Sequence, residues 1–367
     1  MRLLILATTK FAPTYNEKLI SQINYFNSFD NMKADIFIDA SLVEIEKMLS
    51  TSQYDLIYPT TVFDYSNDGS SIISFNSYLY KLLEYYNINY IGSPLFSHLL
   101  LNDKALTNLE SGMGLPNQIV TRQAWIANRK SVEKKLLTFK LPAIVKPNTL
   151  AASLGIDESS IIWNTDDFGK IIDQRFQSFP HLTEILIESY LNDATEYTVS
   201  ITGNTGRYLF NVSKLKSKTQ HHALHSYNSK LTISEKRDFT YVIEDNRGVL
   251  YELQKHTEQL FEQMHLRDMA RFDYLQDKNG KLYLIDANSL PALSNNYLYE
   301  YISTGRLRLE QLLLLICLVA QKRIGLKINT KLLEDEQSFP ARSSRPSGAE
   351  RTADRCGAVF CGGHWCY

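Results

Sequence analysis

The sequence predicts an α/β protein of several domains, on the basis of three observations. With 367 residues, the chain is long enough for two or three domains of roughly 100–200 residues each. Short apolar runs alternate with helical patterns through the first part of the chain, which is typical of a doubly wound parallel sheet. An Asn-Gly pair at residues 279–280 separates two stretches of alternating hydrophobicity, which predicts an antiparallel hairpin.

The first block of the chain, residues 1–94, accounts for the parallel sheet. Its expected strands are the short apolar runs Leu3–Ala7, Ala34–Ile38 and Asp55–Tyr58. Apolar residues at helical spacing predict helices between these strands, over Lys18–Phe26 and Val43–Leu49. Because strand and helix alternate, we expect a doubly wound α/β domain here.

Two further blocks contain both helices and strands. In residues 95–187 we expect helices over Leu95–Leu101 and Lys104–Leu109. A strand should end at Pro147, because proline cannot donate to a sheet ladder. The expected elements of residues 188–336 are a strand, a helix, the hairpin and a last helix: Tyr197–Thr202, Gly248–Met264, Met269–Asn288 and Leu307–Arg323.

The tail, residues 337–367, differs in composition from the rest of the chain. From Pro340 onward it contains no Ile, Leu, Asn or Lys, whereas Arg, Ser, Ala, Gly and Cys are frequent. We expect either a disordered tail or sequence foreign to the natural chain. The spacing of its metal-binding residue types matches no common structural zinc site: Cys356, Cys361, His364 and Cys366.

Composition excludes several classes of protein. The 39 basic and 40 acidic side chains leave a net charge of −1, so no excess positive charge is available for binding nucleic acid. The longest apolar run, Leu312–Ala320, is about half of the ~18 residues that a membrane span needs. Only Cys317 lies outside the tail, so a disulfide framework is not indicated. We therefore expect a cytoplasmic protein with no membrane span and no nucleic-acid partner.

The hairpin should bring charged side chains together. If residues 279–280 form a two-residue loop, both with positive φ, then residues 278 and 281 face each other. The opposed pairs nearer the strand ends are then Asp273 with Asp286 and Arg271 with Asn288. Because side chains alternate between faces, these four share one face of the ribbon. The residues expected on the other, apolar face are Phe272, Tyr274, Tyr283, Ile285 and Ala287.

Two carboxylates in direct opposition repel each other, so a cation must offset their charge. Arg271 alone could do so. The alternative is Mg²⁺ (or Mn²⁺), which takes carboxylate and amide oxygens and keeps waters and substrate phosphates as its remaining ligands. Asp273, Asp286 and Asn288 offer oxygen ligands without His or Cys, so we favour the metal site.

At these residues the sequence resembles the ATP-grasp superfamily, and within it the D-alanine–D-alanine ligases. The family's strand pair ends in Arg-x-Asp and in acidic-x-Asn followed by a small residue, an apolar residue and Pro. The matching segments are Arg271-Phe-Asp273 and Asp286-Ala-Asn288-Ser-Leu-Pro291. The resemblance implies that Asp273, Asp286 and Asn288 hold Mg²⁺ against the ATP phosphates. It also implies a catalytic role for Arg271, on the transferred phosphate.

The resemblance extends upstream and implies how the nucleotide is held. By this resemblance, Lys104 and Lys146 would contact the phosphates, and Glu196 would hold the ribose hydroxyls. Glu188, Tyr190 and Leu191 would form the hinge that contacts the adenine. Taken alone, Lys146 would be an ordinary solvated or ion-pair residue at a strand end. Walker and Rossmann glycine motifs are absent from the sequence. Lysines, metal and a mobile flap must therefore hold the nucleotide.

The resemblance covers about residues 1–330 and implies an ATP-grasp architecture. Residues 1–94 would form an N-terminal α/β domain on the substrate side. Residues 95–187 would form the central ATP-grasp subdomain, or lid, and residues 188–336 the C-terminal subdomain with the metal site. Both of these subdomains would be α+β and would grip ATP between them.

Two stretches depart from the family's pattern, and some further candidates cannot be aligned securely. The loop after Lys146 lacks the acidic-Gly-Ser-Ser sequence and keeps only Ser153 and Gly155, of which Ser153 is our second catalytic candidate. Residues 292–297 replace the family's glycine and small polar residue at the acceptor carboxylate. Two further roles cannot be aligned securely. A phosphate-contacting lysine could be Lys214, Lys216 or Lys218, and Glu17 could bind the amino group of the first substrate. The ATP half is thus better kept than the amino-acid half.

These features predict an ATP- and Mg²⁺-dependent carboxylate–amine ligase that joins small amino acids through an acyl phosphate. Its substrate pair need not be two D-alanines. The alternative is a nucleotide-binding regulatory or non-catalytic protein that has lost its amino-acid site. A ligase acting on a larger peptide or protein is a weaker third possibility, and a homodimer is left open.

Overall fold

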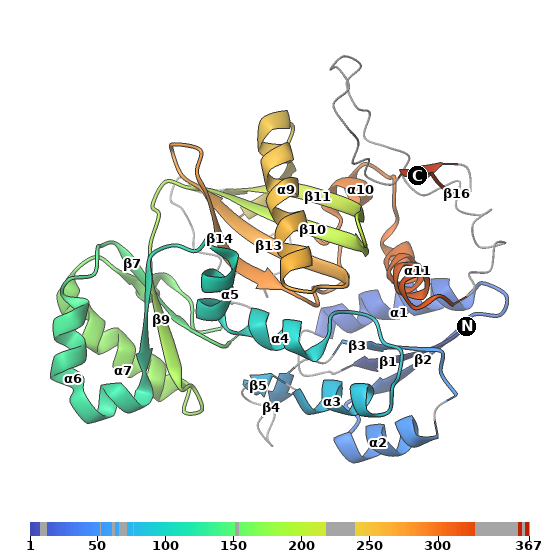
Figure 1. Ribbon diagram of the computed structural model, residues 1–367, viewed down its shortest axis with the longest axis horizontal. Coiled ribbons are helices and arrows are strands. Elements are labelled where there is room, and N and C mark those ends of the chain that lie inside the picture. Colours follow the sequence, from blue (N-terminus) through green and yellow to red (C-terminus); the bar gives the residue numbers. More distant parts are fainter. Residues whose placement is uncertain are drawn as a thin grey trace.

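The protein is built from three larger sheets, each packed against helices (Figure 1). The computed structural model describes residues 1–7, 13–51, 53–60, 63–65, 72–75, 77–150, 154–217, 239–326, 359–361 and 364–366. Within these residues the larger sheets have 3, 4 and 5 strands, and two small hairpins complete the strand inventory. This is the mixed α/β architecture that the sequence predicts.

The first sheet is parallel and has the order β2–β1–β3. Its strands are β1 (Arg2–Ala7), β2 (Lys33–Ile38) and β3 (Leu56–Pro59). Alternate residues of β1 belong to two separate hydrophobic clusters, one with α1 (Pro13–Asn27) and the other with α2 (Leu42–Ser50) and α3 (Ser77–Tyr85). The sheet is therefore buried on both faces, which confirms the predicted doubly wound unit. A hairpin that was not predicted, β4 (Phe63–Tyr65) with β5 (Ile72–Phe75), follows β3.

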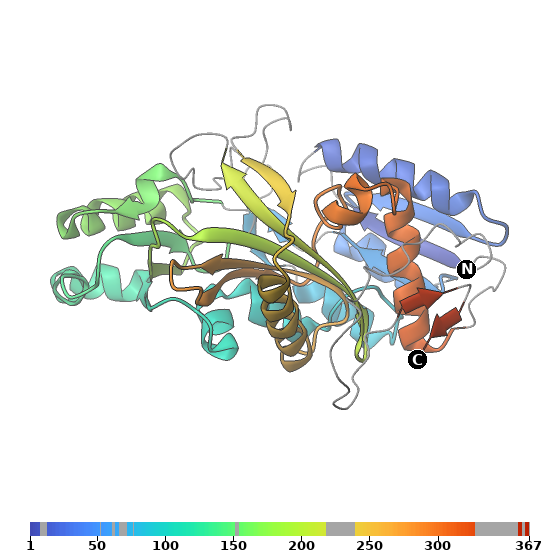
Figure 2. The same cartoon turned by 90° about the horizontal axis from the view of Figure 1, so that it is seen from above.

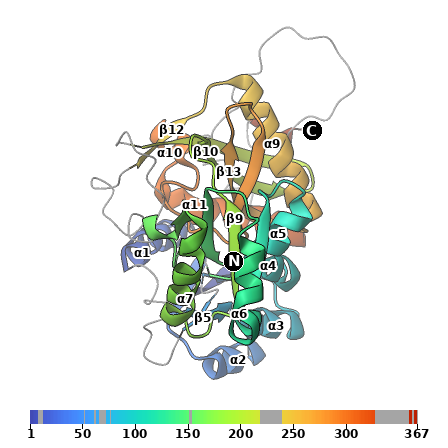
Figure 3. The same ribbon diagram turned by 90° about the vertical axis from the view of Figure 1, so that its left-hand side faces the viewer.

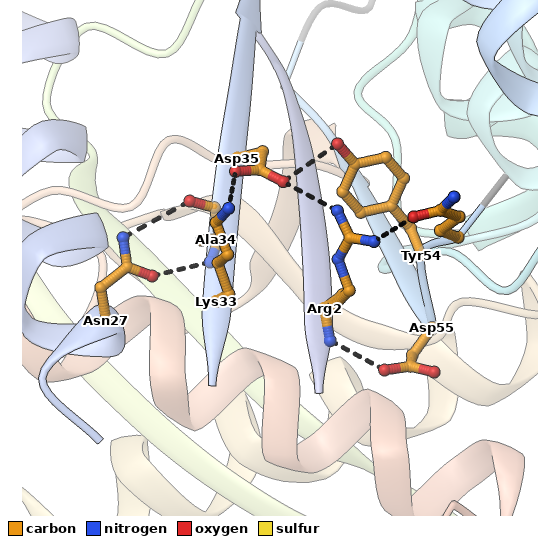
Figure 4. Close-up of polar contacts among 8 residues, drawn as sticks. Arg2, Asn27, Lys33, Ala34, Asp35, Tyr54 and Asp55 are labelled. Carbon is orange, nitrogen blue, oxygen red and sulfur yellow. Dashed lines mark hydrogen bonds and ion pairs between the residues drawn. The ribbon is translucent and has the colours of Figure 1, made fainter. Parts of the chain in front are cut away.

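Polar contacts tie together the amino ends of the first strands (Figure 4). The Tyr54 hydroxyl donates to the Asp35 carboxylate at 3.0 Å, and Arg2 approaches the same carboxylate at 3.5 Å. Asn27, at the end of α1, accepts from the Ala34 amide of β2 at 2.7 Å. Ligand sites of parallel sheets lie at the carboxyl ends of the strands, so these contacts hold the sheet rather than a ligand.

The second sheet is antiparallel, has the order β6–β9–β7–β8 and forms one end of the molecule (Figure 3). Its strands are β6 (Asn117–Thr121), β7 (Ala143–Pro147), β8 (Ile161–Ile162) and β9 (Glu184–Ser189). Helices α6 (Arg122–Leu136) and α7 (Phe168–Ser178) cover one face and share a hydrophobic cluster with it. Short 3₁₀ turns, η1 (Glu158–Ser160) and η2 (Thr165–Asp167), flank β8.

The third sheet is antiparallel, has the order β12–β11–β10–β13–β14 and carries the hairpin. Its strands are β10 (Thr195–Asn204), β11 (Arg207–Ser217), β12 (Phe239–Ile243), β13 (Asp268–Gln276) and β14 (Leu282–Asn288). Helix α9 (Arg247–Gln263) covers its apolar face, where Val199, Phe272 and Phe261 share one hydrophobic cluster. The opposite face is polar near the hairpin.

The hairpin has a different turn from the one predicted. Asp277 N donates to Lys281 O at 3.0 Å, so three residues rather than two form the loop. Gly280 has a φ of +83°, whereas Asn279 is not among the residues with positive φ. A type I turn followed by a left-handed glycine fits this loop. The predicted pairing of residues 278 and 281 is therefore wrong.

A β-bulge restores the predicted pairing closer to the site. Between Asp273 and Tyr274 the register shifts by one residue, so that Ile285 is the extra residue of β14. The shift places Leu284, rather than Tyr283 and Ile285, on the buried face beside Ala287. The predicted apolar face was thus right for Phe272, Tyr274 and Ala287 only.

Several helices join the sheets to one another (Figure 2). Helices α4 (Leu95–Asn102) and α5 (Lys104–Ser111) pack against β14. Helix α11 (Leu312–Ile324), preceded by α10 (Tyr299–Ser303) and the turn η4 (Leu309–Gln311), packs against α1, β10 and β13. The last helix thus joins the first unit to the third sheet, and the predicted domain boundaries stay predictions.

Within the described residues, no helix has both the length and the apolar composition that crossing a membrane requires. Cys317 is buried in α11 and is not in a disulfide. Two short tail strands, β15 (Val359–Cys361) and β16 (His364–Cys366), pair antiparallel. The rest of the tail, with Cys356, lies outside the described residues, and its predicted character stays a prediction.

Candidate functional site

The hairpin residues singled out from the sequence lie together on the polar face of the third sheet. Arg271 of β13 is paired with Asn288 of β14, and Asp273 is paired with Asp286. This confirms the predicted pairs, although the turn that was used to derive them is wrong. The roles assigned to these four residues stay predictions.

Arg271 and Asp273 form an ion pair along their own strand. Arg271 Nε donates to Asp273 Oδ1 at 3.1 Å, and Nη2 donates to Oδ2 at 2.9 Å. The negative charge of Asp273, joined by that of Asp286, raises the pKa of Arg271 above its usual value, against the opposing effect of burial. The Thr198 hydroxyl on β10 also donates to Asp273. Asp273 is therefore held in one orientation by two neighbours.

The charge balance of this cluster leaves room for a cation. Asp273 and Asp286 contribute two negative charges and Arg271 contributes one positive charge, so the arginine does not neutralise the pair. The described residues contain no group of three or more His, Cys, Asp or Glu side chains suited to a metal. A metal here would need Asn288 as a third ligand, which Mg²⁺ accepts because it binds amide as well as carboxylate oxygens. The residues present fit Mg²⁺.

Two rows of polar side chains extend the cluster across the sheet. Next to Asp273, Thr198 is paired with Ser213 of β11; next to Arg271, Ser200 is paired with Asn211. The Ser200 side chain is fully buried, and its Oγ has no hydrogen-bond partner in the described structure. Sequence reasoning missed these rows. Their signal was the alternation of β10, in which polar Thr198 and Ser200 stand between buried apolar residues.

The second sheet brings together two of the predicted nucleotide residues. Lys146 of β7 and Glu188 of β9 form an ion pair, and only 7% and 1% of their surfaces are exposed. Asn108 of α5 donates to the other oxygen of Glu188 at 2.8 Å. Lys146 is thus an ion-pair residue, as the plainer interpretation expected, and Glu188 bridges the sheet to α5.

Lys104 lies at the start of α5, close to the loop that follows β7. Its Nζ donates to Leu150 O at 2.6 Å. The fully buried Asn148 side chain accepts from Ala105 N at 3.0 Å and donates to Glu184 at 3.0 Å. Asn148 therefore fastens the start of α5 to the end of β7, and sequence reasoning did not identify this role.

The predicted hinge follows β9. Tyr190 N donates to Pro142 O at 2.9 Å, and burial raises the pKa of the Tyr190 hydroxyl. The Trp163 ring lies edge-on to Tyr190 at 6.2 Å and is 60% exposed, which is unusual for tryptophan. Leu191 continues the hinge, and Glu196 stands on β10 opposite Leu275.

The remaining candidates do not join the cluster. Lys214 is paired with Tyr197, which lies on the apolar face of the third sheet, so Lys214 and Lys216 project away from the Asp273 face. Glu17 is exposed on α1. Ser153 and Lys218 lie outside the described residues.

Comparison with known proteins identifies the family. The family model described as D-ala D-ala ligase C-terminus matches residues 110–313. The chain belongs to this family. The match covers more than half of the chain and includes β6 to β14, with the cluster described above. The predicted family resemblance is confirmed, and the chain is a member of a family of ATP-dependent ligases.

Similar proteins span most of the chain. It is 25% identical over 297 residues to a D-alanine–D-alanine ligase of a Nitratiruptor species, and the match covers 77% of each chain. A D-alanine–D-alanine ligase of Buchnera aphidicola subsp. Schizaphis graminum is 27% identical over 265 residues, 71% of this chain and 78% of the relative.

Solved structures show the same fold. A D-alanine–D-alanine ligase from Bacillus anthracis, complexed with ATP, superposes with a TM-score of 0.61 at 19% identity. The superposition covers 88% of this chain and 98% of that one. The predicted fold class, α/β with an ATP-grasp architecture, is therefore confirmed.

Proposed function

We propose that the protein is an ATP- and Mg²⁺-dependent carboxylate–amine ligase that joins small amino acids and releases ADP and phosphate. The observation that carries this proposal is the opposed pair Asp273 and Asp286 with Arg271 beside it. Its position inside the residues matched by the ligase family supports the assignment. A substrate carboxylate would take the terminal phosphoryl group of ATP, and an amine would then displace phosphate from the acyl phosphate.

The lid side of the site would hold the nucleotide. Lys146 lies in β7 and Lys104 Nζ donates to Leu150 O just after that strand, so both cations lie close to the segment that would contact the phosphates. Glu188, Tyr190 and Leu191 would hold the base at the hinge, and Glu196 the ribose. Because phosphoryl transfer needs mainly positioning and charge neutralisation, these residues suffice without a covalent enzyme intermediate.

The hairpin would supply the groups that act on the phosphoryl group. Asp273, Asp286 and Asn288 would hold Mg²⁺, which when bound neutralises charge on the ATP phosphates. The ion pair with Asp273 fixes the direction of the Arg271 guanidinium. Arg271 would therefore stabilise negative charge on the transferred group, and on the oxyanion that forms when the amine adds.

Residues 292–297, which depart from the family's pattern at the acceptor carboxylate, support a substrate pair that need not be two D-alanines. Tyr297, in the stretch that departs from the family's pattern, is buried, and its hydroxyl contacts Thr202 at 2.7 Å and Ile201 O at 3.0 Å. Gln22 of α1 donates to Leu293 O at 2.9 Å in the same stretch. Leu293 and Tyr297 are therefore packed into the core, whereas Ala292 and Asn295 of the same segment are exposed.

An amino-acid panel tests the proposal. The purified protein is given Mg-ATP with single amino acids and pairs of both configurations, D-alanine included. Release of ADP is followed, and products are identified by mass spectrometry. We expect ADP and an amide product with at least one pair, and no product from Asp286→Ala, which should melt within a few degrees of the wild type.

Two results would overturn the proposal. Turnover retained by folded Asp286→Ala would exclude the metal assignment. A melting shift with Mg-ATP but no ADP release over the whole panel would favour the alternative, a nucleotide-binding protein without ligase activity.

A further inference from the structure

Asp268, the first residue of β13, is a buried carboxylate that the proposed reaction does not use. Its side chain is fully buried, and its φ is +66°. A left-handed conformation is uncommon for a residue other than glycine. Such a conformation persists only where the surrounding contacts determine it, so the contacts of Asp268 need an explanation.

Four hydrogen bonds from three distant segments reach this carboxylate. Arg323 of α11 donates Nε to Oδ1 and Nη2 to Oδ2, both at 2.8 Å. Gly92 N donates at 2.8 Å, and Asn204 Nδ2, at the end of β10, donates at 3.0 Å. Arg323 Nη2 also donates to Tyr90 O at 2.7 Å. One carboxylate thus joins the end of the first unit, the last helix and the third sheet.

The neighbouring residue strengthens the same junction. Arg267 N donates to Ser93 Oγ at 3.1 Å, and the Arg267 guanidinium lies 5.3 Å from the centre of the Tyr90 ring. Tyr90 is itself bridged to Ile57 of β3, the edge strand of the first sheet. Residues 90–93 are therefore fastened to the start of β13 from two adjacent positions.

The same strand carries the hairpin cluster. Arg271 and Asp273 stand three and five residues after Asp268, which at ~3.4 Å per residue is about 10 and 17 Å along β13. Strand β13 is hydrogen-bonded to β10 along its whole length and to β14 from Arg271 to Gln276. Asp268 and the hairpin cluster therefore lie on one continuous hydrogen-bonded strand, whereas within the described residues Lys146 and Glu188 share no hydrogen bond with the Asp268 network.

We propose that Asp268 is a positioning residue that sets the first unit and the last helix against β13, and so places Arg271 and Asp273 for the reaction. The inference rests on the proposed function. Removing the network would lower turnover while leaving the lid-side ATP contacts in place. A purely structural role would instead lower stability and leave the turnover of each folded molecule unchanged.

The test compares Asp268→Asn, which keeps the size but removes the charge, with Arg175→Lys as a control. Arg175 is a buried arginine of the second sheet's α7 that pairs with Asp157 at 2.9 Å. Arg323→Lys, which keeps the charge but loses the two-point contact, is the second variant if Asp268→Asn does not fold.

Hydrogen exchange and kinetics are measured on each folded variant. In Asp268→Asn we expect amide exchange of residues 90–93 and 269–273 to rise by about tenfold, with residues 143–147 and 185–189 unchanged. Turnover per folded molecule should fall at least tenfold, and KM for ATP should change by no more than about threefold in either direction. Arg175→Lys should show faster exchange on the second sheet alone.

Unchanged turnover per folded molecule, or faster exchange spread evenly over all three sheets, would overturn the inference. If the wild type forms no amide with any amino acid, the proposed function fails instead. The exchange pattern then still decides whether Asp268 couples residues 90–93 to residues 269–273.

Discussion

Arg271 combines a defined contact within the third sheet with the catalytic role that we propose for it. Its two-point contact with Asp273 needs the planar guanidinium, because a lysine ammonium offers a single point charge. The contact lies on the polar face of the sheet and takes no part in the hydrophobic cluster beneath it. Changes at this residue should therefore affect activity much more than stability.

We expect Arg271→Lys to lower the turnover of ADP release by roughly 100–1,000-fold, the range seen when one stabilising donor is removed from an active site. The melting temperature should stay within a few degrees of the wild type. The matched control is Arg129→Lys, in which an exposed arginine of α6 pairs with Asp173 at 2.8 Å. Equal losses in the two variants would show that Arg271 has no special role.

Changes to the ion pair between Lys146 and Glu188 should affect stability strongly, unlike changes at Arg271, because both groups are buried. Glu188→Gln would leave the lysine charge without its partner, at a cost of about 3–5 kcal/mol in the free energy of unfolding. Urea denaturation of the variant measures this loss. The double variant K146M/E188L should recover most of the stability without recovering ATP binding; if it stays as unstable as E188Q, burial of the unpaired lysine is not the cause.

At the scale of elements, the prediction for the hairpin was correct for the pairs Arg271–Asn288 and Asp273–Asp286 and wrong for the turn. The Asn-Gly signal identified the turn's position but not its length. The third loop residue and the extra residue Ile285 of β14 offset each other, so Asp273 still faces Asp286. Alternation in one strand could not reveal this bulge, because bulges depend on packing against neighbouring strands.

The turn makes a direct prediction, because only Gly280 of its three loop residues is left-handed. Gly280→Ala should destabilise the protein by about 1–2 kcal/mol, since φ of +83° strains any side chain there. Apart from Gly280 itself and its two chain neighbours, no described residue comes within 4 Å of the Cβ that the alanine would add, so the loss would come from the backbone alone. Asn279→Ala should change the free energy of unfolding by less than half as much. Equal effects in thermal melts would favour the two-residue turn.

At the scale of the whole molecule, helix α4 connects the first unit to the end of the hairpin. The buried His98 ring of α4 lies 2.6 Å, Nδ1 to Oγ, from Ser289, the residue after Asn288. Burial lowers the pKa of His98 to about 3. An exposed histidine has a pKa of about 6.5. Folding therefore depends on this ring staying neutral.

Between those two pKa values the unfolded chain binds a proton that the folded chain does not. The free energy of unfolding should therefore fall as pH falls, by about 1.4 kcal/mol per pH unit from this residue alone, and the effect should be absent above about pH 6.5. His98→Asn should flatten this dependence in denaturation curves taken between about pH 4.5 and 7. The control is His256→Asn on α9; a parallel slope in the wild type and His98→Asn would contradict the prediction.

Much of the candidate site could be predicted because its residues are close in sequence or follow an ordered motif. Asp273 and Asp286 belong to one hairpin, so counting back from the turn placed them opposite each other, although the count was right only because the third loop residue and the bulge at Ile285 offset each other. The partner of Lys146 and the orientation of Lys214 were not accessible in this way. Both depend on which strands become neighbours, and that is decided by the packing of whole sheets.

By itself, the sequence determined the α/β class, the family resemblance and the presence of Arg271, Asp273, Asp286 and Asn288 in one hairpin. These follow from periodicity and from contacts within a short stretch of chain. Only the tertiary structure decided that Lys146 pairs with Glu188, and that Asp268 joins residues 92, 204 and 323. Such contacts form between segments that are far apart along the chain, and local preferences carry no information about which of these segments meet.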